Sequence, residues 1–234
     1  MRELNRWLFG LLFLGFMNTV MAERLEVFRW QSASYSPEAL VSGMMTAAKL
    51  HEKYGAAVGI YRVDVGGSGN PTFDYVLRWD SGKAWAKTKT TNSNEEWQAF
   101  WAEAAQSPSG ALLWSMEALN WDAAVAAKDF AEDGPYRVYI WQPNPGKAAA
   151  VYAAFTKAKE MHTAMGAKVN IYSEGVGGTG NIHYVLAFDN WANMADFGDA
   201  MTASEEFKFL QAAFAGAAVP IGSIQGEPLY YSAP

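Results

Sequence analysis

Apolar and polar residues follow one pattern in the first half of the chain and repeat it in the second. Residues 25–31 and 137–142 alternate apolar and polar positions, which is typical of short half-buried strands. Residues 37–54 and 148–165 carry apolar side chains three or four positions apart, and each segment stops just before a glycine. The pattern therefore predicts a strand followed by a helix at the start of each half.

Two further strands are predicted after each of these helices. Val, Ile and Tyr are frequent in 57–65 and 73–79 of the first half and in 168–176 and 182–188 of the second half. A short glycine-rich segment separates the two strands of each pair. This layout indicates a hairpin in each half.

A broken helix and a last strand complete each half. The second part of the broken helix is expected to begin near Ser93 and near Ser204, with two glutamates in its first turn. Carboxylates there suit the positive end of the helix dipole. Strands over 112–119 and 222–229 end the two halves, so the order β-α-β-β-α-β occurs twice.

The repetition extends to residue identities. Sliding the sequence over itself by 111 positions aligns Trp30-Gln31 with Trp141-Gln142, His51 with His162, Gly55 with Gly166, and VGGSGN (65–70) with VGGTGN (176–181). We interpret the chain as an internal duplication, with repeats over 23–119 and 136–234. Residues 120–135 form the linker, in which 121–127 is expected to pack as a helix that Asp133-Gly134-Pro135 ends.

The two glycine-rich hexapeptides are predicted to be hairpin turns. A phosphate-binding glycine loop lies between a strand and a helix, so that the helix N-terminus meets the anion. Here each hexapeptide lies between two strands. Glycine is favoured in such turns because it adopts positive φ without steric cost.

The repeated element order resembles the ferredoxin-like plan of the dimeric α/β-barrel superfamily. The similarity covers nearly all of 25–230 and rests on the element order, the broken second helix and the Ser-Glu-Glu-aromatic turn at 204–207. NIPSNAP-type and antibiotic-biosynthesis-monooxygenase-type domains are the most similar members. The resemblance implies an α+β fold in which two tandem ferredoxin-like units pack sheet to sheet as a pseudo-dimeric α/β barrel.

The first 22 residues have the features of a signal peptide. Arg2 and Arg6 precede an apolar run over 7–17, and Val20-Met21-Ala22 fits a signal-peptidase site. An uncleaved anchor is the alternative, but the run is shorter than the roughly 20 residues that span a bilayer. No comparable stretch follows, so we expect a periplasmic or secreted protein that does not enter the membrane after cleavage.

Composition excludes several classes of function. The chain has no cysteine, which excludes disulfides, thiolate metal sites and cysteine nucleophiles. Removing 1–22 deletes two positive charges and one negative charge, which takes the formal net charge from −6 to −7. An acidic protein of this kind is poorly suited to bind nucleic acid. The sequence does not separate a monomer from a homo-oligomer.

Three histidines are the candidate catalytic residues: His51, His162 and His183. His51 and His162 fall on the apolar stripe of the first helix of each half, whereas Lys49 and Glu52 fall on its polar face. A histidine in a last helical turn also stabilises the free carbonyl groups there, which is the structural alternative. No histidine spacing typical of a metal site occurs, so no metal is expected.

Strand alternation provides candidate ligand-binding residues. If Phe28, Trp114 and Met116 face the helices, the opposite face carries the ligand candidates Arg29, Gln31, Arg78, Glu117, Gln142 and Glu227. In a barrel that face is the interior, where buried charges need partners or a polar ligand. Asp74 is predicted on the same face. An Arg29–Glu117 ion pair, or neutralisation of both arginines by Glu117 and Asp74, is the structural alternative. The second half has Ile140 and Ala187 where the first has arginines, so we expect the pocket mainly in the first half.

Three functions are compatible with these features. The first is an exported barrel that binds a small neutral or anionic, partly aromatic molecule. The second is an enzyme, because the resembled superfamily includes cofactor-free monooxygenases, isomerases and haem-dependent chlorite dismutases and peroxidases. The third is a structural or interaction module with a filled interior. The sequence favours no cofactor and leaves haem open.

Overall fold

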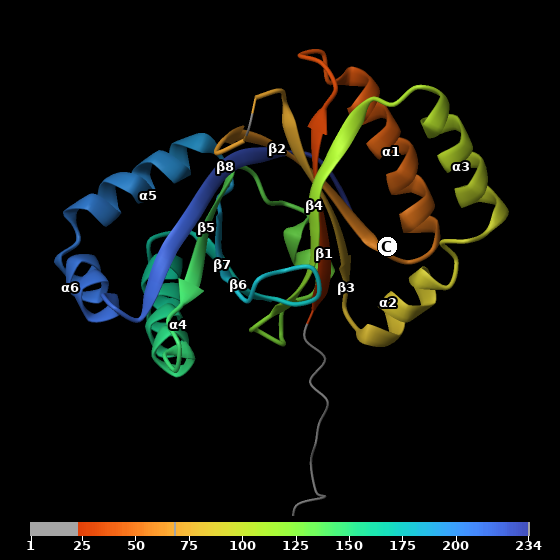
Figure 1. Cartoon of the computed structure of the whole chain (residues 1–234). Helices are drawn as coiled ribbons and strands as arrows, with labels where there is room; N and C mark the ends of the chain where they lie inside the picture. Colours follow the sequence, from red (N-terminus) through yellow and green to blue (C-terminus); the bar gives the residue numbers. More distant parts are fainter. Residues whose placement is uncertain (1–22, 68, 234) are drawn as a thin grey trace, which may run out of the picture.

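A closed barrel of eight antiparallel strands forms the centre of the computed structural model, which describes residues 23–67 and 69–233 (Figure 1). The signal-peptide segment 1–22 lies outside the described residues. The strands are β1 (Arg24–Ser32), β2 (Ala57–Val65), β3 (Thr72–Trp79), β4 (Gly110–Asn120), β5 (Tyr136–Pro143), β6 (Lys168–Glu174), β7 (Ile182–Ala187) and β8 (Ala218–Ser232). The helices are α1 (Glu38–Lys53), α2 (Gly82–Lys89), α3 (Glu95–Gln106), α4 (Ala148–Ala164), α5 (Trp191–Ala203) and α6 (Glu205–Phe214).

Each half of the chain contributes four neighbouring strands of the barrel. The order around the barrel is β1-β3-β2-β8-β5-β7-β6-β4, so the halves contribute β4-β1-β3-β2 and β8-β5-β7-β6. The pairs β2–β8 and β4–β6 join the two sheets by their edges. The predicted α+β barrel is therefore confirmed, and its two sheets are hydrogen-bonded into one closed sheet.

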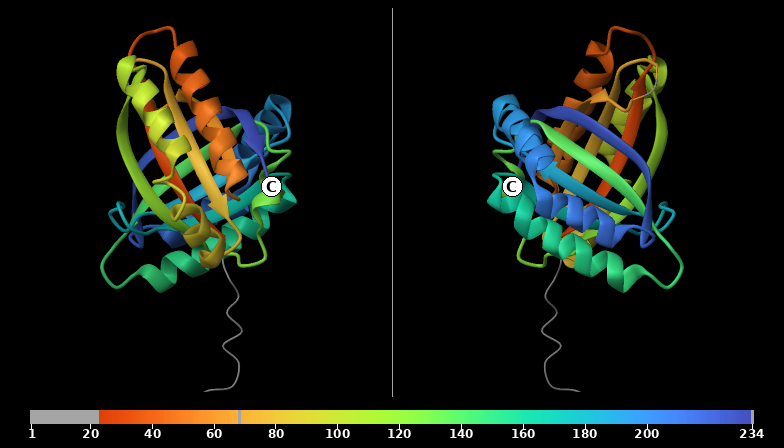
Figure 2. Two further views of the ribbon diagram at one scale, coloured as in Figure 1. Left: turned by 90° about the vertical axis from the view of Figure 1, so that its right-hand side faces the viewer. Right: turned by 90° about the vertical axis from the view of Figure 1, so that its left-hand side faces the viewer.

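The helices form two separate outer layers. Helices α1, α2 and α3 lie against the sheet of the first half, and α4, α5 and α6 lie on the other side of the barrel (Figures 1 and 2). The predicted break in the second helix of each half is confirmed. In the first half Asn94 caps α3 by accepting a hydrogen bond from the Trp97 backbone N–H, and Ser204 accepts one from Phe207 in the second half.

The two glycine hairpins help to close the barrel. Gly66 and Gly177 have φ of +87° and +85°, values that side chains other than glycine rarely adopt. A Cβ on Gly66 would lie 2.4 Å from the Ser223 carbonyl oxygen of β8, and one on Gly177 would lie 2.5 Å from that of Ser115 in β4. Each turn thus packs against the last strand of the opposite half. The hairpin prediction is confirmed, and the close approach gives a further reason for glycine.

The linker between the halves differs from the prediction. A helix was expected over 121–127, but the structure has turns there and a short 3-10 helix at Ala127–Phe130. The side chain of Asn120 accepts a hydrogen bond from the Asp122 backbone N–H, and Asp122 accepts one from Ala124. Such local side-chain bonds compete with the helical hydrogen bonds, which explains the difference.

Candidate functional site

A cavity of about 100 Å³ lies inside the barrel. Both halves line it, with Leu25, Val27 and Val76 from the first and Val138, Val185 and Ile224 from the second. The expectation that the pocket belongs mainly to the first half is therefore wrong. The lining is largely apolar because the inward positions of most strands carry aliphatic residues. Three clusters of charged side chains border it, and Tyr61, Asp133 and Tyr136 line it as well.

The first cluster is an ion pair between Arg29 and Asp74. These residues face each other on the neighbouring strands β1 and β3. Arg29 donates from Nε to Oδ1 at 2.7 Å and from Nη2 to Oδ2 at 2.6 Å. Burial alone would lower the pKa of Arg29, but the bonds and charge of Asp74 raise it above its ordinary value. Arg29 therefore stays charged and forms a bidentate ion pair with Asp74.

The second cluster surrounds Arg78 in the barrel. Its Nη1 donates to Glu23 Oε1 at 2.5 Å and to the Tyr172 hydroxyl at 2.9 Å. Glu23 is fully buried, and its other oxygen accepts from Asn120 and Tyr172. The guanidinium also lies 3.7 Å from the centre of the Phe130 ring. Burial alone would lower the Arg78 pKa, but these hydroxyl and carboxylate partners raise it.

The third cluster joins Glu174 at the end of β6 to His183 in β7. His183 lines the cavity, and its Nε2 lies 2.7 Å from Glu174 Oε1. The other carboxylate oxygen accepts from the backbone N–H groups of Thr179 and Asn181 at 2.6 and 3.0 Å. Burial alone would raise the pKa of Glu174, but the hydrogen bonds from His183 and the turn lower it to about 2. Glu174 is consequently a carboxylate at neutral pH.

Only two of the six candidate ligand-binding residues line the cavity, namely Arg29 and Arg78. Gln142 is exposed on its strand, and Glu227 binds Arg62 at 2.7 Å and Trp191 at 3.1 Å. Gln31 is partly buried near the end of β1 and does not border the cavity.

Glu117 lies on the outer face of β4, so the expected Arg29–Glu117 ion pair does not form. Strand pairing aligns Trp114 with Arg29 and Met116 with Val27, which places both apolar side chains in the cavity. The expectation that Trp114 and Met116 face the helices is therefore wrong. Register between neighbouring strands sets this face, and a single strand's sequence does not reveal it.

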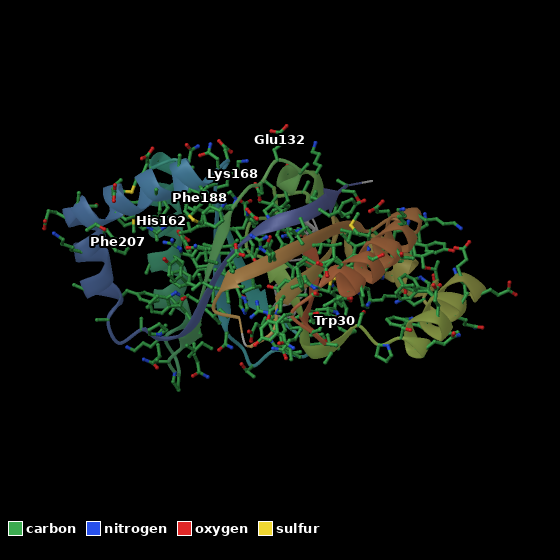
Figure 3. The ribbon with its side chains drawn as sticks, turned by 90° about the horizontal axis from the view of Figure 1, so that it is seen from above. Trp30, Glu132, His162, Lys168, Phe188 and Phe207 are labelled. Atoms are coloured by element: carbon green, nitrogen blue, oxygen red, sulfur yellow. The ribbon has the colours of Figure 1, made fainter. Side chains whose placement is uncertain are left out.

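The histidines of the two long helices lie outside the barrel. The Nδ1 of His51 is 2.8 Å from the Tyr75 hydroxyl, and that of His162 is 2.9 Å from the Tyr184 hydroxyl. Figure 3 shows His162 beside Phe207 in the helical layer of the second half, away from Trp30 in the first. Burial lowers the pKa of both histidines to about 4, with the charge of Lys89 as a further cause at His51.

An open groove of about 760 Å³ lies outside the barrel, between the linker and α4. Its wall includes the rings of Trp121 and Tyr152, whose centres are 4.8 Å apart and whose planes are tilted by 30°. The Lys159–Asp122 ion pair, at 2.8 Å, borders the same groove. None of the candidate site residues lines it.

The three histidines do not fit a haem. His162 has a buried Nε2 without a hydrogen-bond partner, but the rings of Phe197 and Phe207 pack around it, and neither the cavity nor the groove borders it. His183 borders a cavity well below the roughly 300–1,000 Å³ of pockets that hold larger ligands. Among the described residues, no group of three or more potential ligands could hold a metal ion.

None of the described helices has the length and apolar character needed to cross a bilayer. The sequence candidates that the structure brings together are Arg29, Arg78 and His183. The sequence reasoning named Asp74 as a partner of the arginines, which the structure bears out for Arg29, and it missed Glu23 and Glu174.

Comparison with known proteins supports the fold. No protein-family model matches this sequence, and no curated protein sequence matches it. A provisionally assigned monooxygenase from Fusobacterium nucleatum subsp. nucleatum is similar in structure, with a TM-score of 0.62, 11% identity, and coverage of 91% of this chain and 95% of that chain. An anthrone oxidase-like protein has a TM-score of 0.56 and 12% identity, with coverage of 90% and 93%.

A provisionally assigned chlorite dismutase is also similar, with a TM-score of 0.54, 10% identity, and coverage of 89% of this chain and 95% of that chain. At these identities the similarity establishes the barrel fold. The chemistry of the cavity depends on the residues of this chain that line it.

Proposed function

We propose that the barrel cavity binds a small neutral molecule. The observation that carries this proposal is an internal cavity whose charged side chains already have partners. Arg29 is paired with Asp74 and Arg78 with Glu23, so an anionic ligand would meet no unpaired cation among them. An apolar lining with a few oriented polar groups is typical of small-molecule sites.

The volume limits the size of the ligand. An engineered protein cavity of roughly 150 Å³ binds benzene. The cavity here is about 100 Å³, so we expect ligands somewhat smaller than benzene. This narrows the neutral or anionic, partly aromatic ligand expected from the sequence to a compact neutral one.

A cavity-filling substitution tests the proposal. Val138 lines the cavity, whereas Val219 lies half-exposed outside it, so Val138→Phe and Val219→Phe make a matched pair. Nitroethane and acetone are suitable probes, followed by two-dimensional NMR. We expect saturable shifts at cavity residues in the wild type and Val219→Phe and none in Val138→Phe. Absence of binding to the wild type, or equal binding to Val138→Phe, would contradict the proposal.

An enzyme is the second candidate. Its support is the structural similarity to a provisionally assigned monooxygenase and to an anthrone oxidase-like protein, together with a histidine–carboxylate pair in the cavity wall. A structural module with a filled interior is less well supported, because the interior contains a cavity.

We also propose that the protein is exported and cleaved after Ala22. The support is the sequence of 1–22 alone. N-terminal sequencing of the purified protein should then give Glu-Arg-Leu-Glu. An intact Met1 in a membrane fraction would contradict export with cleavage.

A tandem duplication of one ferredoxin-like unit is our proposal for the origin of the chain, in keeping with its resemblance to NIPSNAP-type domains. Its support is the 111-residue alignment together with the same strand order in both halves. In an experimental structure, His51 should superpose on His162 and Gly66 on Gly177. Halves that superpose only in a different register would argue against duplication.

A further inference from the structure

Glu174 and His183 form a histidine–carboxylate pair with a defined direction. Glu174 accepts hydrogen bonds from two backbone N–H groups of the turn and, at 3.2 Å, from the side-chain amide of Asn181. An ionised carboxylate is acceptor-only, so His183 must donate its Nε2–H in the 2.7 Å bond. In the neutral imidazole the lone pair then belongs to Nδ1. The carboxylate therefore fixes which nitrogen of His183 accepts a proton.

The surroundings of this pair suit a proton transfer. His183 is 8% exposed and borders a cavity that is lined mostly by apolar side chains, in which Arg29 and Asp74 are already paired with each other. A proton taken up by the ring would create an imidazolium that is already paired with Glu174. This arrangement, a base oriented by a carboxylate, is one that enzymes use to hold an imidazole in one tautomer.

Arg29 lines the same cavity from the first half. Its Nε and Nη2 bind Asp74, and a guanidinium has further N–H donors on Nη1. Such donors stabilise negative charge that develops on an oxygen during a reaction. The cavity thus combines a base from one half with N–H donors of an ion-paired guanidinium from the other.

We propose that His183 acts as a general base toward a small carbon acid in the barrel cavity, with Glu174 as its positioning residue. This rests on the proposed function. The substrate class is a compact neutral molecule with a C–H bond next to a carbonyl or nitro group. The C–H bond breaks, its electron pair delocalises onto the carbonyl or nitro oxygens, and the proton forms an N–H bond at Nδ1 of His183. Return of a proton from the imidazolium restores the reactant.

Hydrogen–deuterium exchange of nitroethane in D₂O tests this step without any co-reactant. The imidazolium exchanges its proton with solvent and returns deuterium to carbon, so the CH₂ signal disappears from the proton NMR spectrum. We expect the wild type to accelerate exchange over buffer in a saturable way. Binding of nitroethane is measured separately, by chemical-shift titration of the same samples.

Three variants separate the roles. His183→Gln keeps a donor to Glu174 and should reduce enzyme-dependent exchange at least 100-fold, in line with the usual contribution of general base catalysis, while nitroethane still binds. Glu174→Gln should lower the maximal exchange rate about 10-fold or more, and the ¹⁵N shifts of His183 should show a mixture of tautomers. His51→Gln, which removes a tyrosine-bound histidine outside the barrel, is the matched control and should exchange like the wild type.

The outcomes distinguish this inference from the proposed function. Nitroethane that binds the wild type without accelerated exchange, or equal exchange by His183→Gln, would overturn the base and leave the binding site standing. Unchanged tautomer shifts in a folded Glu174→Gln would overturn the positioning role. Failure of nitroethane and acetone to bind at all would count against both proposals.

Discussion

The two halves of the barrel place different chemistry at the same position of the third strand. Asp74 of β3 and His183 of β7 each precede an aligned Tyr-Val-Leu segment, and both point into the cavity. In the first half the partner is Arg29 on the neighbouring strand, which makes a closed ion pair. In the second half the partner is Glu174, held by its own hairpin turn. The fold sets where the side chain points, and the sequence of each half decides its chemistry.

A second pair of positions shows the same contrast. Arg78 of β3 corresponds to Ala187 of β7, and both line the cavity. Arg78 and its partner Glu23 occupy the barrel interior, whereas Ala187 is small and leaves space. The cavity is therefore shared by both halves although its charges are unevenly distributed. Four predictions test this comparison.

Loss of the Arg78 charge should have the largest effect. Arg78→Met leaves Glu23 buried without its cation, which typically costs about 3–5 kcal/mol in the free energy of unfolding. Chemical denaturation measures this value. Adding Glu23→Gln should recover part of the loss, and Ala187→Ser in the other half should change stability little. A loss below about 1 kcal/mol in Arg78→Met would show that the cluster is hydrated and contributes little.

Substitution of the hairpin glycines should have the next largest effect on the free energy of unfolding. Gly66→Ala and Gly177→Ala each combine positive φ with a Cβ placed 2.4 or 2.5 Å from a backbone carbonyl of the opposite half. We expect each to cost about 2 kcal/mol or more in thermal or chemical unfolding. Gly180→Ala is the matched control, because Gly180 has φ +84° but open space around its Cβ position, so it should lose about 1 kcal/mol. Equal losses at all three glycines would mean that the close approach has no effect.

The helix histidines should make stability depend on pH. Burial lowers the pKa of His162 to about 4 in the folded state, below the unfolded value of 6.5. The contribution of the neutral His162 to the free energy of unfolding is fully present above pH 6.5 and is lost as the pH falls toward 4. This loss is on the order of 2 kcal/mol. His162→Gln should therefore flatten the pH dependence of unfolding over this window. His51→Gln should flatten it similarly, because burial and the charge of Lys89 lower the pKa of His51 to about 4 as well. Equal slopes in wild type and His162→Gln would refute the assignment.

The smallest effect is expected at Arg62, the third arginine of the first half without a counterpart in the second. Its ion pairs with Asp64 and Glu227 lie at the surface, where the Arg62 side chain is 45% exposed. Exposed pairs are worth about 0–1 kcal/mol, so Arg62→Met should barely change the unfolding free energy. A loss comparable to that of Arg78→Met would remove the distinction between interior and surface arginines.

The sequence by itself determined the element order and the hairpins. As predicted, helices α1 and α4 end just before Gly55 and Gly166, and each glycine hexapeptide joins two strands. These features could be predicted because they depend on residues close together in the chain. The alternation of side chains along β1 and β3 also correctly predicted that Arg29, Asp74 and Arg78 lie on the interior face of the barrel.

Only the tertiary structure shows which side chains pair with Arg78 and His183 and which face of β4 points into the barrel. Pairing of β4 with β1 turned Trp114 and Met116 inward and Glu117 outward. Glu23 reaches Arg78 across 55 residues, and Glu174 reaches His183 only because a turn folds β7 back on β6. Register and contacts between distant segments fix these relations, and the periodicity of a single strand contains no information about them.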